Sequence, residues 1–109
     1  MNMSNHDVDD TIDRIGQLVT WVASTLAQHP DDVEVEAHQY DQDLEFNLLV
    51  HQEDMKFIIG RNGDNIRALR ALVKASSPSP HAHVALHVDS WQEIGDGLTP
   101  TERGQDDQA

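Results

Sequence analysis

Apolar residues in the first quarter of the chain recur at spacings of three and four. They are Val8, Ile12, Ile15, Val19, Val22 and Leu26. This spacing places them on one stripe along a helix. Aspartates at positions 7, 9 and 10 suit the positive end of a helix dipole, and Pro30 cannot continue the helix. The pattern predicts a helix from residue 8 that ends before Pro30, and the stripe is too short for a coiled coil, which favours packing against a core.

Three later segments alternate between apolar and polar residues, as half-buried strands do. Residues 33–37 and 44–50 flank a turn-forming cluster at 40–43, Tyr-Asp-Gln-Asp, which predicts an antiparallel hairpin. Residues 82–88 form the third segment. We therefore expect three strands.

The residues between the second and third predicted strands indicate two helices joined by a tight turn. Glu53 and Asp54 open a short helical stretch that closes at Gly60, and Asp64 is placed to cap a second helix that reaches about Ala75. The predicted inner face of this second helix consists of Ile66, Leu69, Leu72 and Val73. Such a crossover allows the third strand to lie parallel to the second. The predicted order is α-β-β-α-α-β, an α+β domain whose three helices pack on one face of a mixed three-stranded sheet.

Length and composition suit one domain with polar ends. The chain has 109 residues, and we expect disordered segments at 1–7 and 91–109 around a domain at 8–90. No window approaches the roughly 18 apolar residues of a membrane span, and the N-terminus is acidic, so we expect a cytoplasmic protein that does not contact membranes. The absence of cysteine excludes disulfides, thiolate metal sites and cysteine nucleophiles.

The charges are unevenly distributed along the chain. The net charge is −13, which taken alone argues against a polyanionic partner. However, the segment from 56 to 74 holds five of the seven basic residues and only one of the twenty acids, Asp64. Exposed charges more than about 10 Å apart are largely screened at ~0.1 M salt. A phosphate that touches this segment would therefore be attracted to it in spite of the distant acids.

A Gly-x-x-Gly turn, Gly60-Arg-Asn-Gly63, lies inside this basic segment. Glycine permits a sharp turn and lets a phosphate approach the backbone. The N–H groups at the start of the following helix would face the same point, where Arg61 adds a full charge. Arg67, Arg70 and Lys74 form a ridge along that helix. Each feature alone has an ordinary structural explanation as a cap, a turn or a solvated face, but together they favour contact with the phosphates of a single strand.

Three stretches of sequence resemble one family, the small single-domain bacterial KH proteins known as KhpA. They are Glu53-Asp54-Met55, Ile59 to Gly63, and Leu69 to Ala75, and residues 30–35 also look like the family's approach to its first strand. The resemblance covers about residues 8–90. It implies a type II KH fold and non-catalytic binding of single-stranded RNA, as in an RNA chaperone or post-transcriptional regulator. It also implies a homodimer, or a heterodimer with a larger KH-containing protein.

The resemblance also implies roles for individual residues. Gly60, Arg61, Asn62 and Gly63 would clamp the RNA backbone. Ile59 and Ile66 would line the adjoining apolar groove, while Arg67, Arg70 and Lys74 would contact phosphates or sugars. Asp64 stands where relatives often carry a basic residue. An acid there can cap the helix but repels phosphate, so we expect weak binding.

Other interpretations of the sequence remain open. The outward positions of the predicted strands hold His38, His51, His83 and His87, which would share one face able to bind zinc or to titrate at about pH 6 to 7. Solvated histidines are the simpler interpretation, so we predict no metal site and no cofactor. No nucleophile and base are grouped, so we predict no catalytic residue. Trp21 suits a dimer contact as well as ordinary helix packing. The alternative function is an acidic protein–protein interaction module with a vestigial KH groove.

Overall fold

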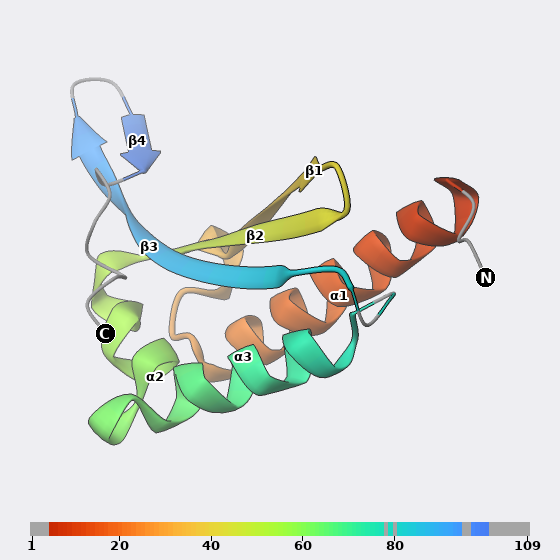
Figure 1. Cartoon of the computed structure of the whole chain (residues 1–109). Helices are drawn as coiled ribbons and strands as arrows, with labels where there is room; N and C mark the ends of the chain where they lie inside the picture. The colour runs from red at the N-terminus through yellow and green to blue at the C-terminus, as the bar shows by residue number, and fades with distance from the viewer. Residues whose placement is uncertain (1–4, 78, 80, 95–96, 101–109) are drawn as a thin grey trace.

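The computed structural model describes residues 5–77, 79, 81–94 and 97–100 (Figure 1). Its helices and strands follow one another as α1 (Asn5–Leu26), β1 (Glu34–Tyr40), β2 (Asp43–Val50), α2 (Met55–Ile59), α3 (Asp64–Ala75), β3 (Val84–Ile94) and β4 (Gly97–Pro100). Three short 3-10 turns, η1 (Pro30–Asp32), η2 (Gln52–Asp54) and η3 (Arg61–Gly63), lie between these elements. Up to β3, this is the predicted α-β-β-α-α-β order.

The predicted mixed sheet is confirmed. β1 pairs antiparallel with β2, and β2 pairs parallel with β3 (Figure 1). The parallel pair needs a crossover between its strands, and α2 and α3 supply it. The α2–α3 turn therefore lies inside the crossover that joins the two parallel strands.

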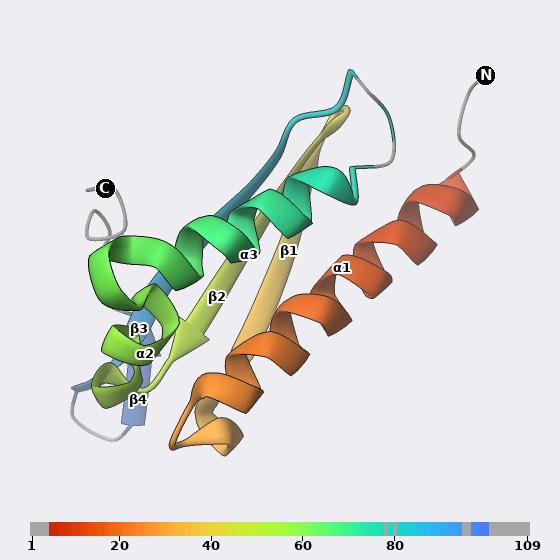
Figure 2. The same ribbon diagram turned by 90° about the horizontal axis from the view of Figure 1, so that it is seen from below.

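The helices cover one face of the sheet and enclose the core with it. Figure 2 shows α1 and α3 side by side across that face. In α1, Ile15, Val19 and Ala23 are buried, so the stripe seen in the sequence packs against the core. The strands contribute alternate residues to the same core, namely Leu44, Phe46, Leu48, Val50, Val84, Leu86 and Val88. Each fully buried aliphatic or phenyl group stabilises the fold by about 1.5–3 kcal/mol relative to exposure.

The inner face of α3 is narrower than predicted. Ile66, Leu69 and Val73 are buried as expected, but Leu72 is 50% exposed, so its predicted place in the core is wrong. Successive helical residues are rotated by about 100°. Leu72 is therefore turned away from Val73 and lies at the border of the apolar stripe.

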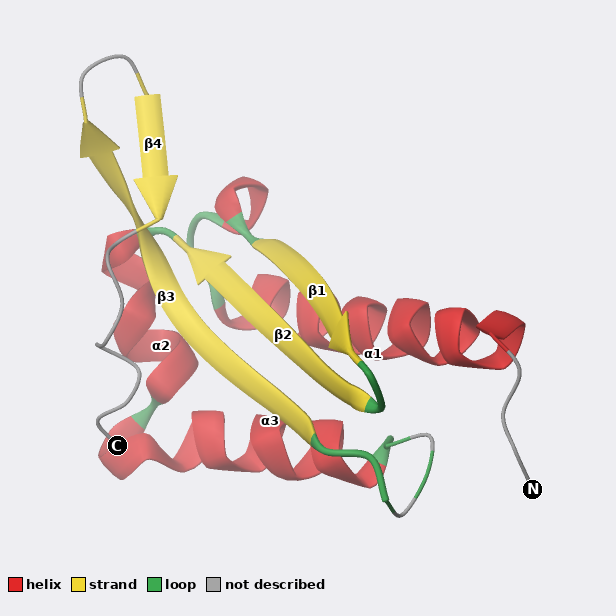
Figure 3. Cartoon of the chain, turned by 45° about the horizontal axis from the view of Figure 1, so that its top comes forward, coloured by secondary structure: helices red, strands yellow, loops and turns green. Residues whose placement is uncertain are grey.

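Both predicted ends of the domain also need correction. α1 begins at Asn5, three residues before the predicted start at Val8. The segment at 91–109 was expected to be a disordered tail, but β3 continues to Ile94 and β4 (Gly97–Pro100) pairs antiparallel with it (Figure 3). The backbone ladder of such a hairpin does not require apolar side chains, which is why low apolar content misled the prediction. The predictions for residues 1–4, 95–96 and 101–109 lie outside the described residues.

Candidate nucleic-acid interface

The turn between α2 and α3 has an unusual backbone conformation. Gly60, Asn62 and Gly63 have positive φ angles of 79°, 58° and 77°. The N–H of Gly60 closes α2 by donating to the carbonyl of Lys56 (2.9 Å), and the N–H of Gly63 donates to the carbonyl of Gly60 (3.1 Å). Glycine and asparagine are the residues that tolerate positive φ best. The sequence Gly-Arg-Asn-Gly therefore fits this turn, in which Arg61 alone keeps an ordinary backbone and carries an exposed cationic side chain.

The side chain of Asn65 connects the two helices on either side of the turn, a role that the sequence did not predict. Its Nδ2 donates to the carbonyl of Phe57 at 2.9 Å and so joins the first turn of α3 to α2. A methyl group at position 60 would lie only 2.6 Å from Cγ of Asn65. Gly60 is therefore required twice, once for its positive φ and once for the close approach of the Asn65 side chain.

Arg67 is folded back onto the turn. One of its terminal nitrogens donates to the carbonyl of Asn62 (2.8 Å), and the other donates to Oδ1 of Asp64 (2.6 Å). Both side chains of the ion pair are largely exposed, so the pair itself adds little to stability. Its effect is on the turn itself: Arg67 places a cation beside the Asp64 carboxylate and donates a hydrogen bond to the carbonyl of Asn62, whose φ is positive.

Arg70 contacts β3 ahead of the residues of β3 that pair with β4. Its Nε donates to the carbonyl of Leu86 at 3.0 Å. The carbonyl of His83 accepts from Leu44 of β2, and carbonyl groups alternate in direction along a strand, so that of Leu86 points away from β2. Arg70 therefore links α3 to the edge of β3 that faces away from β2.

The remaining predicted site residues differ in accessibility. Ile59 is half-buried and packs against the core, while Ile66 is only 7% exposed and belongs to it. Lys74 is exposed near the end of α3, about 15 Å along the helix axis from its start. Among the described residues, no side chain forms an ion pair with Arg61 or Lys74. The turn thus groups residues 59–63 with Arg67, whereas Arg70 and Lys74 extend the basic ridge away from it.

Asp54 holds the segment after α1 close to the beginning of α2, a role that the sequence also did not predict. Its carboxylate is fully buried and accepts from the backbone N–H groups of Gln28 and His29, both at 2.9 Å. Burial raises the pKa of Asp54, but these hydrogen bonds and the nearby His29 ring outweigh burial and hold the pKa below its usual range. The carboxylate joins the segment after α1 to the residue that precedes α2, and so helps to fix the position of α2.

Comparison with known proteins identifies the family. The sequence model of the KH domain of KhpA and KhpB matches residues 16–88, a span that contains the turn, both helices beside it, β1, β2 and the first part of β3. The chain belongs to the KhpA/KhpB KH-domain family. Residues 60–63, with the sequence Gly-Arg-Asn-Gly, join α2 to α3 inside the matched span. This segment is called the GxxG loop below for its sequence.

Several curated relatives carry the name RNA-binding protein KhpA. The protein from Halalkalibacterium halodurans is 38% identical over 71 residues, which cover 65% of this chain and 93% of the relative. The one from Lactiplantibacillus plantarum is 35% identical over 79 residues, or 72% of this chain and 93% of the relative. The one from Bacillus subtilis is 32% identical over 66 residues, or 61% and 82%.

The histidines of the KH domain do not share one face. His38 and His87 lie on the outer face of the sheet, where His87 Nε2 is 3.7 Å from a carboxylate oxygen of Glu45. His51 instead stacks on His29 beyond the end of β2, with ring centroids 3.9 Å apart. The predicted four-histidine face is therefore wrong for His51, because the chain turns into η2 at this residue and no longer follows the strand.

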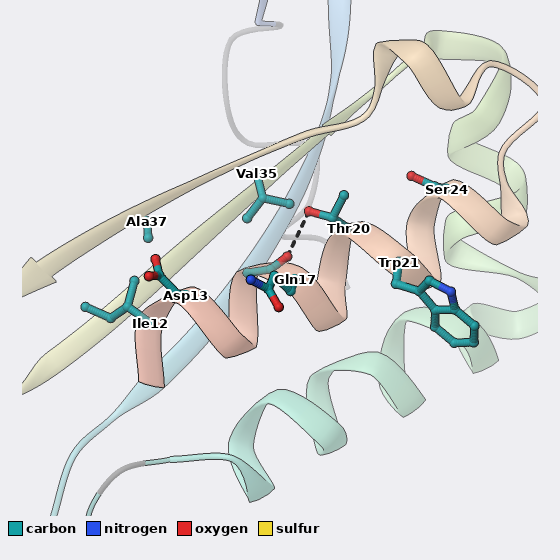
Figure 4. A pocket seen from close by; sticks show the side chains of 9 residues that line it. Ile12, Asp13, Gln17, Thr20, Trp21, Ser24, Val35 and Ala37 are labelled. Carbon is teal, nitrogen blue, oxygen red and sulfur yellow. Dashed lines mark hydrogen bonds between the residues drawn. The ribbon is translucent and has the colours of Figure 1, made fainter. Parts of the chain in front are cut away.

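An open, mainly apolar groove lies between α1 and β1, away from the GxxG loop (Figure 4). Ile12, Val35 and Ala37 line it, and Trp21 stands at its border with 69% of its surface exposed. Trp21 is therefore not packed in the core of the domain.

No helix in the described part of the chain is long and apolar enough to cross a membrane.

Proposed function

We propose that this chain binds single-stranded RNA without catalysis and holds the RNA backbone at the GxxG loop. The observation that carries the proposal is the conformation of residues 60–63, where three residues have positive φ angles. The exposed Arg61 just before α3 forms no ion pair within the described part of the chain. Gly63 stands at the N-cap of α3 and makes no side-chain cap hydrogen bond there. The N–H of Asp64 is bonded to the carbonyl of Arg61, so the attraction for a phosphate would come from the positive end of the α3 dipole together with the Arg61 charge. The names of the curated relatives support the same function.

The basic ridge extends this contact along the strand. Arg61 and Lys74 would meet phosphates directly. Arg67 and Arg70 would contact phosphates or sugars through donors that remain available, since a guanidinium has five N–H groups and each arginine uses only one or two on the protein itself. Ile59 would face the bases beside the loop, with Ile66 beneath it as part of the groove floor.

If one KH groove binds RNA only weakly, a dimer with two grooves would bind it more tightly. We propose that the chain acts in the cytoplasm as an RNA chaperone or post-transcriptional regulator, either as a homodimer or with a larger KH-containing protein. Joining two grooves makes the second contact intramolecular and raises the overall affinity. The acidic exterior would limit binding to RNA that reaches the loop.

Titration with short single-stranded RNA at several salt concentrations tests this function. Each neutralised phosphate of a single strand contributes a slope of about −0.7 in log affinity against log salt, so about three contacts give a slope near −2. The variant Arg61→Asp/Asn62→Asp should bind much more weakly. A control with the same charge change far from the loop, Arg14→Asp/Gln39→Asp, should retain most of the affinity.

Equal binding by the wild type and the loop variant would overturn the assignment, as would a failure of both to bind. Either result would favour the alternative of an acidic protein–protein interaction module with a vestigial groove, in agreement with the net charge of −13. A loop variant that unfolds is recognised by its circular dichroism spectrum. Asn62→Asp conserves tolerance of positive φ, so we expect the fold to persist.

A further inference from the structure

Three potential metal ligands meet at the junction of η1 and η2, outside the GxxG loop. One ligand atom from each of His29, His51 and Glu53 can be chosen so that all lie within 4.8 Å of one another. Nε2 of His29 is 3.6 Å from Oε1 of Glu53, and the two imidazole rings are stacked. We propose that these three side chains bind a divalent transition metal ion of the zinc class.

The buried Asp54 carboxylate lies behind the proposed ligand His29 and can orient its ring. Nδ1 of His29 is buried and has no hydrogen-bond partner in the described part of the chain, and the closest carboxylate oxygen, Oδ2 of Asp54, is 3.4 Å away. Histidines that bind metals usually direct their second ring N–H to a carboxylate, which fixes the tautomer and orients the ligating nitrogen. With Nδ1 of His29 directed at Asp54, its Nε2 lone pair is free and lies beside Glu53.

The ligand types select the class of ion. Two imidazoles and one carboxylate, with a water in the fourth position, form a set typical of tetrahedral zinc. Magnesium and calcium prefer oxygen ligands throughout and would not use the histidine rings. All three side chains are at least partly accessible, so an ion can enter from solvent.

Coordination would rearrange His51. In the structure its Nδ1 accepts from the backbone N–H of Glu53 at 3.0 Å, which places the ring proton of the neutral form on Nε2. Binding through Nε2 requires this proton to move to Nδ1, so the hydrogen bond to Glu53 must open. Zinc–ligand bonds of about 2.0–2.1 Å also require the stacked rings to splay until their lone pairs converge. The amide of Glu53 therefore reports on occupancy.

The ion would connect two segments that are distant in sequence. His29 follows α1, whereas His51 and Glu53 lie between β2 and α2, and in Figure 1 the residues after α1 pass close to this turn. A ligand that binds only the folded state stabilises it. Zinc at this junction would therefore stabilise the N-terminal end of α2, which the hydrogen bonds of Asp54 already connect to the segment after α1.

The test is a calorimetric titration of zinc chloride into the full chain without an affinity tag. We expect one zinc ion per chain. A parallel NMR titration should show chemical-shift changes at the Glu53 amide and at the ring protons of His29 and His51. His51→Asn and Glu53→Gln should each weaken binding by about tenfold or more, because losing a ligand costs at least as much as losing an outer-shell partner. Asparagine at position 51 still offers an N-cap acceptor for Glu53, so that variant should fold.

His83→Asn is the matched control, because His83 is exposed and outside the cluster. It should bind zinc as the wild type does, and magnesium chloride should leave the three reporter residues unshifted. The proposal is overturned if His83→Asn and His51→Asn bind zinc equally well. It is also overturned if zinc shifts other histidines and leaves His29 and His51 unchanged.

Discussion

The indole Nε1 of Trp91 donates a hydrogen bond to the backbone carbonyl of Asp32 at 2.7 Å, although 59 residues separate them in sequence. Trp91 belongs to β3 and Asp32 precedes β1, so the side chain must pass over the end of β2, which lies between them. The tryptophan side chain therefore links β3 to the segment that leads into β1.

Removing the Trp91 hydrogen bond should destabilise the domain. We expect Trp91→Phe to lower the free energy of unfolding by about 1 kcal/mol. Trp91→Ala should lower it by about 2 kcal/mol, since the packing of the partly buried indole ring is lost as well. Urea denaturation followed by circular dichroism measures both changes. Trp21→Phe is the control, because Trp21 is mostly exposed and should change stability by less than about 0.5 kcal/mol.

The buried Asp54 carboxylate should contribute to stability in a pH-dependent way. Asp54→Asn removes a charged acceptor of two backbone N–H groups, and we expect a loss of about 2 kcal/mol at pH 7 in metal-free protein. Because the pKa of Asp54 is lowered in the folded state, its contribution is complete above the unfolded value of about 3.9 and declines as the pH falls through the folded pKa.

Chemical denaturation of the wild type and of Asp54→Asn between neutral pH and pH 3, with a chelator present, measures this contribution. The difference between the two proteins should be constant near neutrality and shrink only below about pH 4. A difference that instead grew with acidity would contradict the lowered pKa.

Gly60 should not tolerate alanine. The substitution forces a side chain into positive φ and against Asn65, and we expect a cost of about 2 kcal/mol or more in unfolding free energy, together with weaker RNA binding. Gly16 is the matched control, since a methyl group there meets no atom within 4 Å and the residue lies inside α1. Gly16→Ala should raise stability by about 0.5–1 kcal/mol. Thermal unfolding of both variants checks the contrast, and equal effects would remove the role assigned to the Gly60 conformation.

Asp64 should moderate the affinity for RNA through Arg67. Asp64→Asn removes the carboxylate that pairs with the guanidinium, so a phosphate at the loop would meet a more available cation. We expect affinity to rise several-fold and the salt slope to steepen by up to about −0.7, the value for one additional phosphate contact. Asp13→Asn, which makes the same charge change on α1, should have little effect. If both variants bind RNA alike, the Asp64–Arg67 pair does not regulate the contact.

Local patterns were enough to predict much of the fold and the position of the loop. The spacing of apolar residues determined which side of α1 faces the core, since a helix repeats within one turn and carries that information in its own sequence. In the same way, the two glycines at 60 and 63 marked a turn that requires positive φ, because this requirement belongs to the backbone itself. The pattern failed at Leu72, at the border of the stripe, where a small rotation decides between core and solvent.

Only the tertiary structure decided the contacts between segments that are far apart in the chain. Asp54 resembled a helix-opening residue, and nothing local showed that Gln28 and His29 would donate to its buried carboxylate. The stacking of His29 on His51 and the reach of Trp91 to Asp32 depend in the same way on how α1 and the strands pack. Sequence periodicity determines which face of an element is apolar, whereas the packing of the elements determines which polar groups come into contact. These contacts between distant segments hold α2 beside the segment after α1 and bring His29 and His51 together.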